Sequence, residues 1–114
     1  MKFERFEDII AWQKAQELAL NIYEIFKSNK DFSFKDQVQK ASISISSNVA
    51  EGFERKSNNE LKYFCFIAKG SSAEVRSLIY LAQRLGYIKS SDFERCIELA
   101  TSISKMLSSL IKTL

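Results

Sequence analysis

Apolar residues recur every three or four positions along almost the whole chain, and no proline interrupts them. This spacing places them on one face of an α-helix, which has about 3.6 residues per turn. Proline breaks the interior of a helix and glycine weakens it, and the 114 residues include no proline and only three glycines. The pattern therefore predicts long helices and an all-α fold.

The apolar spacing and the turn-forming residues divide the chain into four predicted helices within a single domain, residues 1–114. The predicted helices span residues 7–28, 34–55, 58–85 and 92–112. Three Ser-x-x-acid sequences, beginning at Ser33, Ser57 and Ser91, have the spacing of a helix-capping box. Four helices of similar length with short connections predict an antiparallel up-down-up-down four-helix bundle.

One stretch of the second predicted helix allows another interpretation. Residues 42–46 read Ser-Ile-Ser-Ile-Ser, and such alternation of polar and apolar residues is also typical of a β-strand. Helical spacing continues on both sides, and no turn-forming residue separates this stretch from its flanks. The flanking pattern favours a helix.

The composition excludes several classes of enzyme and metal site. The chain has no histidine, so Ser-His-Asp and Cys-His nucleophiles and histidine-containing di-iron sites are excluded. Cys65 and Cys96 lie 31 positions apart, and two cysteines without histidine are too few for a zinc site. We therefore expect a protein that is not an enzyme, has no metal or cofactor, and carries buried, reduced thiols.

The N-terminal sequence and the apolar runs bear on localisation. The first residues contain no apolar signal-peptide segment. The longest uninterrupted apolar run, residues 63–68, spans six residues, whereas a membrane-spanning helix needs about 20. These features predict a cytoplasmic protein with no membrane partner.

The predicted helix 58–85 is apolar on more sides than one face of a small bundle requires. Its main stripe runs from Leu61 to Leu85, and other apolar residues lie outside that stripe. A second seam with small residues in its middle consists of Phe66, Gly70, Ala73, Ser77 and Tyr80. This helix is either the central helix of its own bundle or part of a subunit interface. The limited interior of a 114-residue chain favours the interface, and hence a homo-oligomer.

Three cations share one face of the same predicted helix, because Lys62, Lys69 and Arg76 are seven residues apart. Arg84 lies further along, slightly rotated. Such a row suits the phosphate backbone of RNA or DNA, although a solvated charged face is the alternative. The net charge of +3 is only a mild bias, but an oligomer would repeat the row in every copy.

Polar residues close to the apolar stripe of helix 34–55 suggest structural roles. Asn48 and Glu51 lie near that stripe, and Glu51 is spaced to pair with Arg55 one turn later. Lys69 and Arg76 are alternative partners for the carboxylate. A structural ion pair is favoured over a catalytic role, because no second catalytic partner is evident.

Four sequence motifs carry a resemblance to a known family. They are residues 6–12, residues 37–52 ending in Ser-Asn-Val-Ala-Glu-Gly, residues 67–74, and residues 85–88. In this order they resemble the four-helix-bundle proteins encoded within intervening sequences of bacterial 23S rRNA genes, also described as ribosomal-protein-like. The resemblance extends from Phe6 to about Leu110.

The resemblance implies a ring-like homopentamer without enzymatic activity. Related proteins are accessory factors of diversity-generating retroelements. The resemblance therefore also implies RNA or DNA as a partner, and a reverse transcriptase or a ribosomal component as a protein partner. By position, Lys40 matches one of two commonly basic family residues and is a further candidate for binding nucleic acid, as is Arg84, although the residues alone place Lys40 in a solubilising cluster. The positions that the resemblance assigns to packing and interfaces are Asn48, Glu51, Gly52, Gly70, Ser71 and Glu74. A protein-interaction scaffold with no affinity for nucleic acid is the alternative function.

Overall fold

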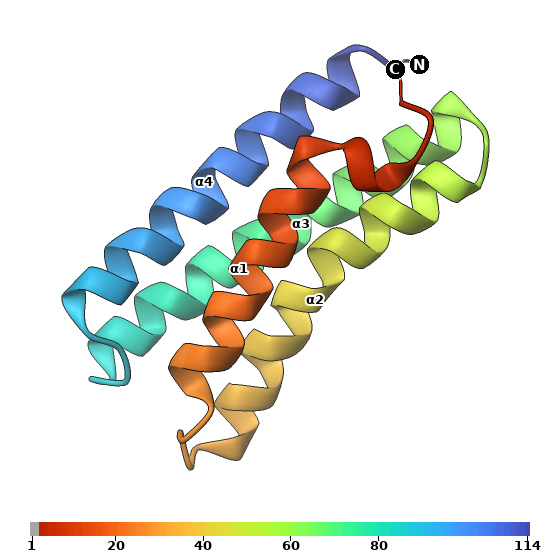
Figure 1. Ribbon diagram of the computed structural model, residues 1–114. Helices are drawn as coiled ribbons and strands as arrows, with labels where there is room; N and C mark the ends of the chain where they lie inside the picture. The colour runs from red at the N-terminus through yellow and green to blue at the C-terminus, as the bar shows by residue number, and fades with distance from the viewer. Residues whose placement is uncertain (1–2) are drawn as a thin grey trace.

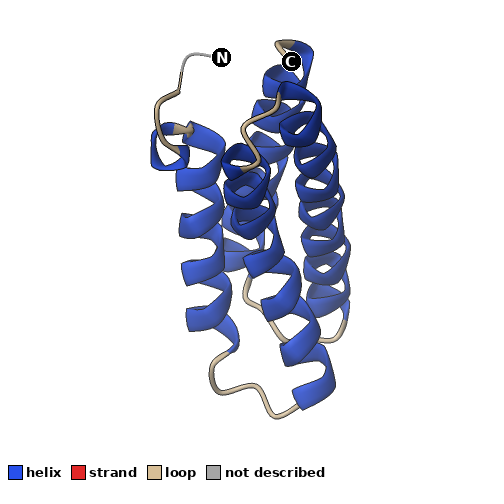
Figure 2. Cartoon of the chain, turned by 90° about the vertical axis from the view of Figure 1, so that its right-hand side faces the viewer, coloured by secondary structure: helices blue, strands red, loops and turns tan. Residues whose placement is uncertain are grey.

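The computed structural model describes residues 3–114, in which four α-helices pack side by side (Figure 1). The helices are α1 (Ile10–Phe26), α2 (Phe32–Glu54), α3 (Asn58–Arg84) and α4 (Ser90–Lys112). A short 3-10 helix, Phe6–Asp8, precedes α1. The described part of the chain contains no strand (Figure 2), which confirms the predicted all-α class.

Contacts between α2 and α3 show that these helices run antiparallel. Gln37 contacts Glu74, and Ser44, seven residues later, contacts Ser71, which comes earlier in α3. As residue numbers rise along α2, the numbers of the contacting residues in α3 fall, which happens only between antiparallel helices. Contacts between α1 and α2 and between α3 and α4 fall in the same descending order. Together with the pairing of α1 and α4, they give the up-down-up-down arrangement of Figure 1.

One apolar core runs along the length of the molecule and is lined by all four helices. On α3 the buried face differs from the predicted stripe, because Cys65, Ser72 and Ile79 are fully buried whereas Leu85 is 48% exposed. The cause is that α3 packs against both α2 and α4. The buried face of α3 therefore lies between the predicted stripe and a neighbouring stripe that contains Cys65, Ser72 and Ile79.

The helix starts agree with the predicted capping boxes at only one of three places. The Ser57 hydroxyl accepts a bond from the Glu60 amide at 3.3 Å, as predicted. For α2, the cap is Asp31, whose carboxylate accepts from the Phe34 amide, and the prediction of Ser33 is wrong. For α4, the helix follows Lys89 without a side-chain cap, so Ser91 does not cap it.

The alternating residues 42–46 lie inside α2, which excludes the strand interpretation. Ser42, Ile45 and Ser46 are buried, as expected of residues three and four positions apart on one helical face. The Ser42 hydroxyl donates to the Gln39 carbonyl, and Ser46 accepts from Gln16 of α1. These bonds satisfy hydroxyl groups that face the core.

The last turn of α2 approaches the first turns of α3 unusually closely. A Cβ atom added to Gly52 would lie 2.6 Å from the Cβ atom of Phe64 and 3.3 Å from the Cα atom of Leu61. Only glycine leaves room for α3 at this height. The motif position of Gly52 therefore has a packing role.

Candidate interaction surface

The outward side of α3 carries a group of exposed apolar side chains, which we call the α3 face. Tyr63, Phe66 and Tyr80 are 62%, 52% and 51% exposed, and Ile67 and Leu81 are also exposed. All five residues of the predicted seam lie on this face and reach solvent: Phe66, Gly70, Ala73, Ser77 and Tyr80. The single chain therefore leaves uncovered the surface that the sequence predicts as an interface.

Gly70 lies in the middle of the α3 face and has no packing role within residues 3–114. A Cβ atom added there would meet nothing within 4 Å, in contrast to Gly52. Glycine in the interior of a helix costs about 0.8–1 kcal/mol relative to alanine. Within the described chain nothing compensates this cost, whereas a second backbone packed on the α3 face would.

The predicted row of cations follows the edge of the α3 face that borders α4. Arg76 lies one turn from both Ser72, which bonds to Ser104 of α4, and Tyr80, whose ring packs on Phe93 of α4. Lys62 and Lys69 continue the row at intervals of seven residues. Within residues 3–114, none of these three cations forms an ion pair, and the buried Nε of Arg76 has no hydrogen-bond partner.

The structure does not bring the other two predicted phosphate-binding residues into this row. Arg84 follows Arg76 by eight residues, which rotates it by about 80° around the helix. Lys40 lies on α2, three residues from Gln37 and four from Ser44, both of which contact α3. Lys40 is therefore on the α2 side of the α3 face, opposite the row.

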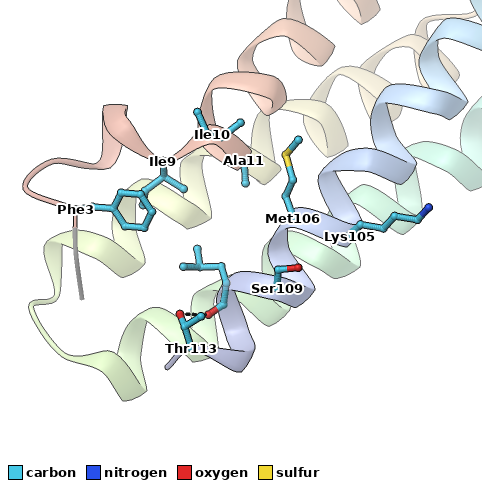
Figure 3. Close-up of a pocket in the computed structure, with 9 residues that line it drawn as sticks. Phe3, Ile9, Ile10, Ala11, Lys105, Met106, Ser109 and Thr113 are labelled. Atoms are coloured by element: carbon cyan, nitrogen blue, oxygen red, sulfur yellow. Dashed lines mark hydrogen bonds between the residues drawn. The ribbon is translucent and has the colours of Figure 1, made fainter.

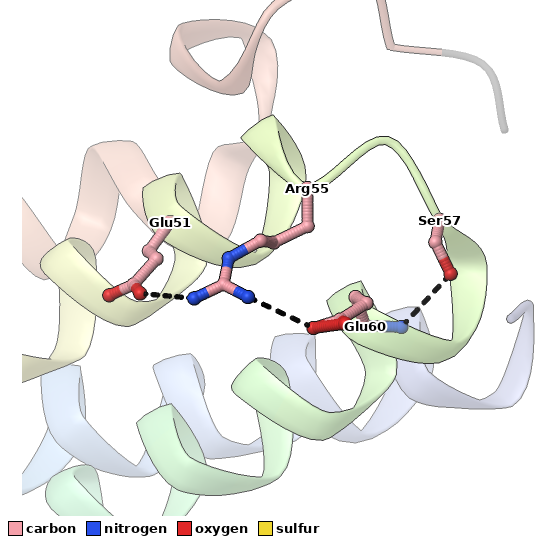
Figure 4. Close-up of polar contacts among 4 residues, drawn as sticks. All are labelled: Glu51, Arg55, Ser57 and Glu60. Atoms are coloured by element: carbon pink, nitrogen blue, oxygen red, sulfur yellow. Dashed lines mark hydrogen bonds and ion pairs between the residues drawn. The ribbon is translucent and has the colours of Figure 1, made fainter.

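The predicted pair of Glu51 and Arg55 is present and belongs to a larger group at the α2–α3 turn (Figure 4). The Arg55 guanidinium lies 3.0 Å from the Glu51 carboxylate and 3.5 Å from that of Glu60, and it stacks over the Phe64 ring. The Glu51 side chain is half exposed rather than at the core. Arg55 therefore links the end of α2 to the start of α3.

The remaining motif residues also contact neighbouring helices or their own backbone. The Asn48 amide donates to the Ser44 carbonyl at 2.7 Å and to the Ser44 hydroxyl at 2.9 Å. Glu74 accepts from Gln37 at 3.4 Å, and Ser71 contacts Ser44. The contacts of Ser71 and Glu74 connect α2 to α3, whereas the bonds of Asn48 stay within α2.

A cavity of about 620 Å³ opens between the start of α1 and the end of α4. Figure 3 shows Ile10 and Ala11 above it, Phe3 and Ile9 to one side, and Met106 to the other. Its wall is completed by Lys105, Ser109, Leu110 and Thr113. The sequence did not predict this cavity, because it depends on how far α1 and α4 separate.

A second, more polar hollow continues between α1 and α4, and Met106 lines both. Its carboxylates are those of Glu17, Glu94 and Glu98. Lys14 pairs with Glu17, and Arg95 pairs with Asp92. Within residues 3–114 this leaves Glu94 and Glu98 without an ion pair. We call the two hollows together the α1–α4 groove.

The described residues offer little for covalent or metal chemistry. Burial raises the pKa of both the Cys65 and the Cys96 thiol to about 11, so both are protonated at neutral pH. Residues 3–114 contain no cluster of three or more His, Cys, Asp or Glu side chains that could hold a metal ion. In the same residues, no helix is both long and apolar enough to cross a membrane.

Comparisons with known proteins agree with the fold and with the motifs. The family model described as "23S rRNA-intervening sequence protein" matches residues 7–109. A crystal structure of a protein of unknown function from the S23 ribosomal protein family of Bacteroides thetaiotaomicron VPI-5482 is 26% identical, with a TM-score of 0.83. The similarity covers 90% of this chain and 98% of that one. No curated protein sequence matches this chain.

Proposed function

This chain belongs to the family of 23S rRNA-intervening sequence proteins, and from that premise we propose that it is a non-enzymatic assembly module whose identical copies associate through the α3 face. The observation that carries the proposal is the exposure of Phe66, Tyr80 and the small residues between them. Contiguous apolar patches on small soluble proteins mark interaction sites. The resemblance to the family supports five copies.

The first test measures the mass of the protein in solution by light scattering at micromolar concentration. We expect a multiple of the 13.1 kDa chain for the natural protein, and a single chain for the variant Phe66→Glu/Ala73→Glu. Both residues are exposed, so the variant should keep its helical circular dichroism. The matched control is Leu20→Glu, which places a charge on an apolar side chain of α1 that is 72% exposed. A natural protein of 13.1 kDa in solution would refute the proposal.

We propose binding of the phosphate backbone of RNA or DNA as a second activity. Its support is that Lys62, Lys69 and Arg76 stand in a row without ion pairs inside the chain. An assembly would repeat this row in every copy and add the fields together. Phosphate contacts of this kind tolerate any base sequence and weaken steeply with salt.

The second test measures the anisotropy of labelled single-stranded and duplex RNA and DNA over a range of salt concentrations. We expect the triple variant Lys62→Glu/Lys69→Glu/Arg76→Glu to lose binding. The control Lys27→Glu/Lys30→Glu/Lys35→Glu changes the net charge by the same amount at the α1–α2 turn. This control should retain most of the binding to RNA and DNA. The mass of each variant is measured in the same buffer, which separates lost contacts from lost assembly. Absence of binding by the natural protein at low salt would favour a scaffold for a protein partner, such as a reverse transcriptase or a ribosomal component.

A further inference from the structure

Residues 3–114 present two unpartnered surfaces on different sides of the molecule, the apolar α3 face and the α1–α4 groove, which is apolar in its first hollow and carries carboxylates in its second. We infer that the α1–α4 groove of one copy is the docking site for the α3 face of the next. The inference rests on the proposed self-association and names its second surface. A patch that meets itself produces only a two-fold dimer, whereas two different patches produce rings or filaments.

The groove offers room for an aromatic side chain at the height of Phe66. Ser72 of α3 bonds to the Ala100 carbonyl and to the Ser104 hydroxyl of α4, which sets the relative height of the two antiparallel helices. Phe66 lies six residues before Ser72, so it is level with residues 106–110 of α4. Met106 and Leu110 line the 620 Å³ cavity (Figure 3). A neighbour standing alongside with a parallel axis therefore presents Phe66 at the height of the cavity.

The charges of the two surfaces complement each other towards the other end of the groove. Arg76 lies four residues after Ser72, which puts it level with Glu98 in α4, and Tyr80 is level with Glu94. Arg76 has no ion pair within the described chain, and neither do Glu94 and Glu98. In the same alignment, Arg76 of one copy meets Glu98 of the next, and opposite charges fix the register of such a contact. Arg76 is then withdrawn from the phosphate-binding row, which leaves Lys62 and Lys69.

One pair in this alignment is unfavourable. Lys69 lies three residues before Ser72, which makes it level with Lys105, a cation at the rim of the cavity. The docked arrangement therefore predicts that Lys105→Glu strengthens the assembly. A surface that bound only nucleic acid would give the opposite result, because the substitution removes a cation.

A charge exchange followed by analytical ultracentrifugation tests the inference. We expect Arg76→Glu and Glu98→Arg each to raise the dissociation constant of the assembly about tenfold or more, and the double variant to restore most of it. A mixture of the two single variants should show partial recovery. Independent effects without recovery in the double variant would overturn the pairing of Arg76 with Glu98.

A cavity-filling variant provides a second measurement that does not depend on charge. Ser109 is exposed and lines the cavity, so Ser109→Trp should fill the cavity without disturbing the core, and the assembly should dissociate. The control Ser47→Trp places the same ring on an exposed position of α2, outside both surfaces. An assembly unchanged by Ser109→Trp would overturn the inference.

The outcomes separate this inference from the proposed function. Dissociation by Phe66→Glu/Ala73→Glu, with no effect of the groove variants, would mean that the α3 face meets itself, so the inference fails and the assembly module stands. Loss of RNA binding by Arg76→Glu without any change in mass would assign Arg76 to nucleic acid and also overturn the inference. A natural protein that is a single chain would overturn both.

Discussion

Gly52 and Gly70 show how the same residue type serves two surfaces of one chain. Gly52 lies where α3 approaches α2, and an added Cβ atom would come within 2.6 Å of the Phe64 side chain. Gly70 lies on the α3 face above open space. The first glycine is required by the fold of the chain, whereas the second is explained by the partner that we propose.

The two glycines therefore respond differently to alanine. We expect Gly52→Ala to destabilise the chain by about 1–3 kcal/mol through overpacking, partly offset by the better helix propensity of alanine. Gly70→Ala should stabilise the chain by about 0.8–1 kcal/mol, because only propensity changes. Urea unfolding, measured in the monomeric Phe66→Glu/Ala73→Glu background, gives both values. Equal shifts for the two variants would contradict the packing role of Gly52.

Among the elements, the two loops at the end of the molecule opposite the termini are tied to each other. Asp31, the N-cap of α2, accepts a 2.7 Å bond from the Tyr87 hydroxyl in the loop between α3 and α4. The Tyr87 ring also packs edge-on against Phe34. The contact connects the first helical hairpin to the second, which are otherwise joined in sequence only by the α2–α3 turn.

This contact predicts a specific dependence of stability on pH. The bond from Tyr87 and the Phe34 amide lower the pKa of Asp31 below its usual 3.8. The Asp31 carboxyl is therefore protonated at a higher pH in the unfolded chain than in the folded chain. The stabilisation that this contact gives the folded chain is complete above a pH of about 4–5 and is lost as the pH falls towards the lowered pKa. We expect Tyr87→Phe to lower the urea midpoint at pH 7. The midpoint of this variant should also fall less steeply than that of the natural protein as the pH is lowered (the acid limb of the curve).

Tyr23→Phe is the control for this prediction, because Tyr23 is an exposed tyrosine of α1. The same bond raises the pKa of Tyr87 above its usual 10, so its stabilisation is complete below a pH of about 10 and is lost as the pH rises through the raised pKa. An acid limb that is identical in Tyr87→Phe and in the natural protein would show that the bond contributes nothing in solution.

The elements themselves followed from the sequence, but several of their contacts did not. The 3-4 spacing predicted four helices, and the structure confirms the all-α class. The cap at Asp31 did not follow from the sequence, because Asp31 lies between the predicted helices 7–28 and 34–55 and the capping-box spacing there points to Ser33. The predicted burial of Cys65 is confirmed, whereas the burial of Ser72 was not predicted, because single-helix periodicity does not show that α3 packs between α2 and α4.

Helical periodicity made one of the two candidate surfaces predictable, the α3 face, but not the α1–α4 groove. Periodicity places Phe66, Ala73 and Tyr80 on one side of a helix, and the structure leaves that side exposed. The α1–α4 groove depends on the spacing between two helices that are distant in sequence. No local pattern in either helix encodes that spacing.

For the whole molecule, association of folded copies couples stability to concentration. Copies that bind only when folded raise the thermal midpoint as the protein concentration rises. We expect the midpoint from differential scanning calorimetry to increase by several degrees over a hundredfold range of concentration. The Phe66→Glu/Ala73→Glu variant should show no increase. A constant midpoint for the natural protein over that range would argue against assembly.

The burial of both thiols has a practical consequence for fluorescence work on this protein. Cys65 and Cys96 are hidden in the core and protonated at neutral pH, so maleimide dyes should leave them unmodified in the folded chain. A single cysteine introduced at an outward position such as Ser47 could then be tagged selectively, with both native cysteines left in place. Energy transfer between donor-tagged and acceptor-tagged copies would report subunit exchange directly.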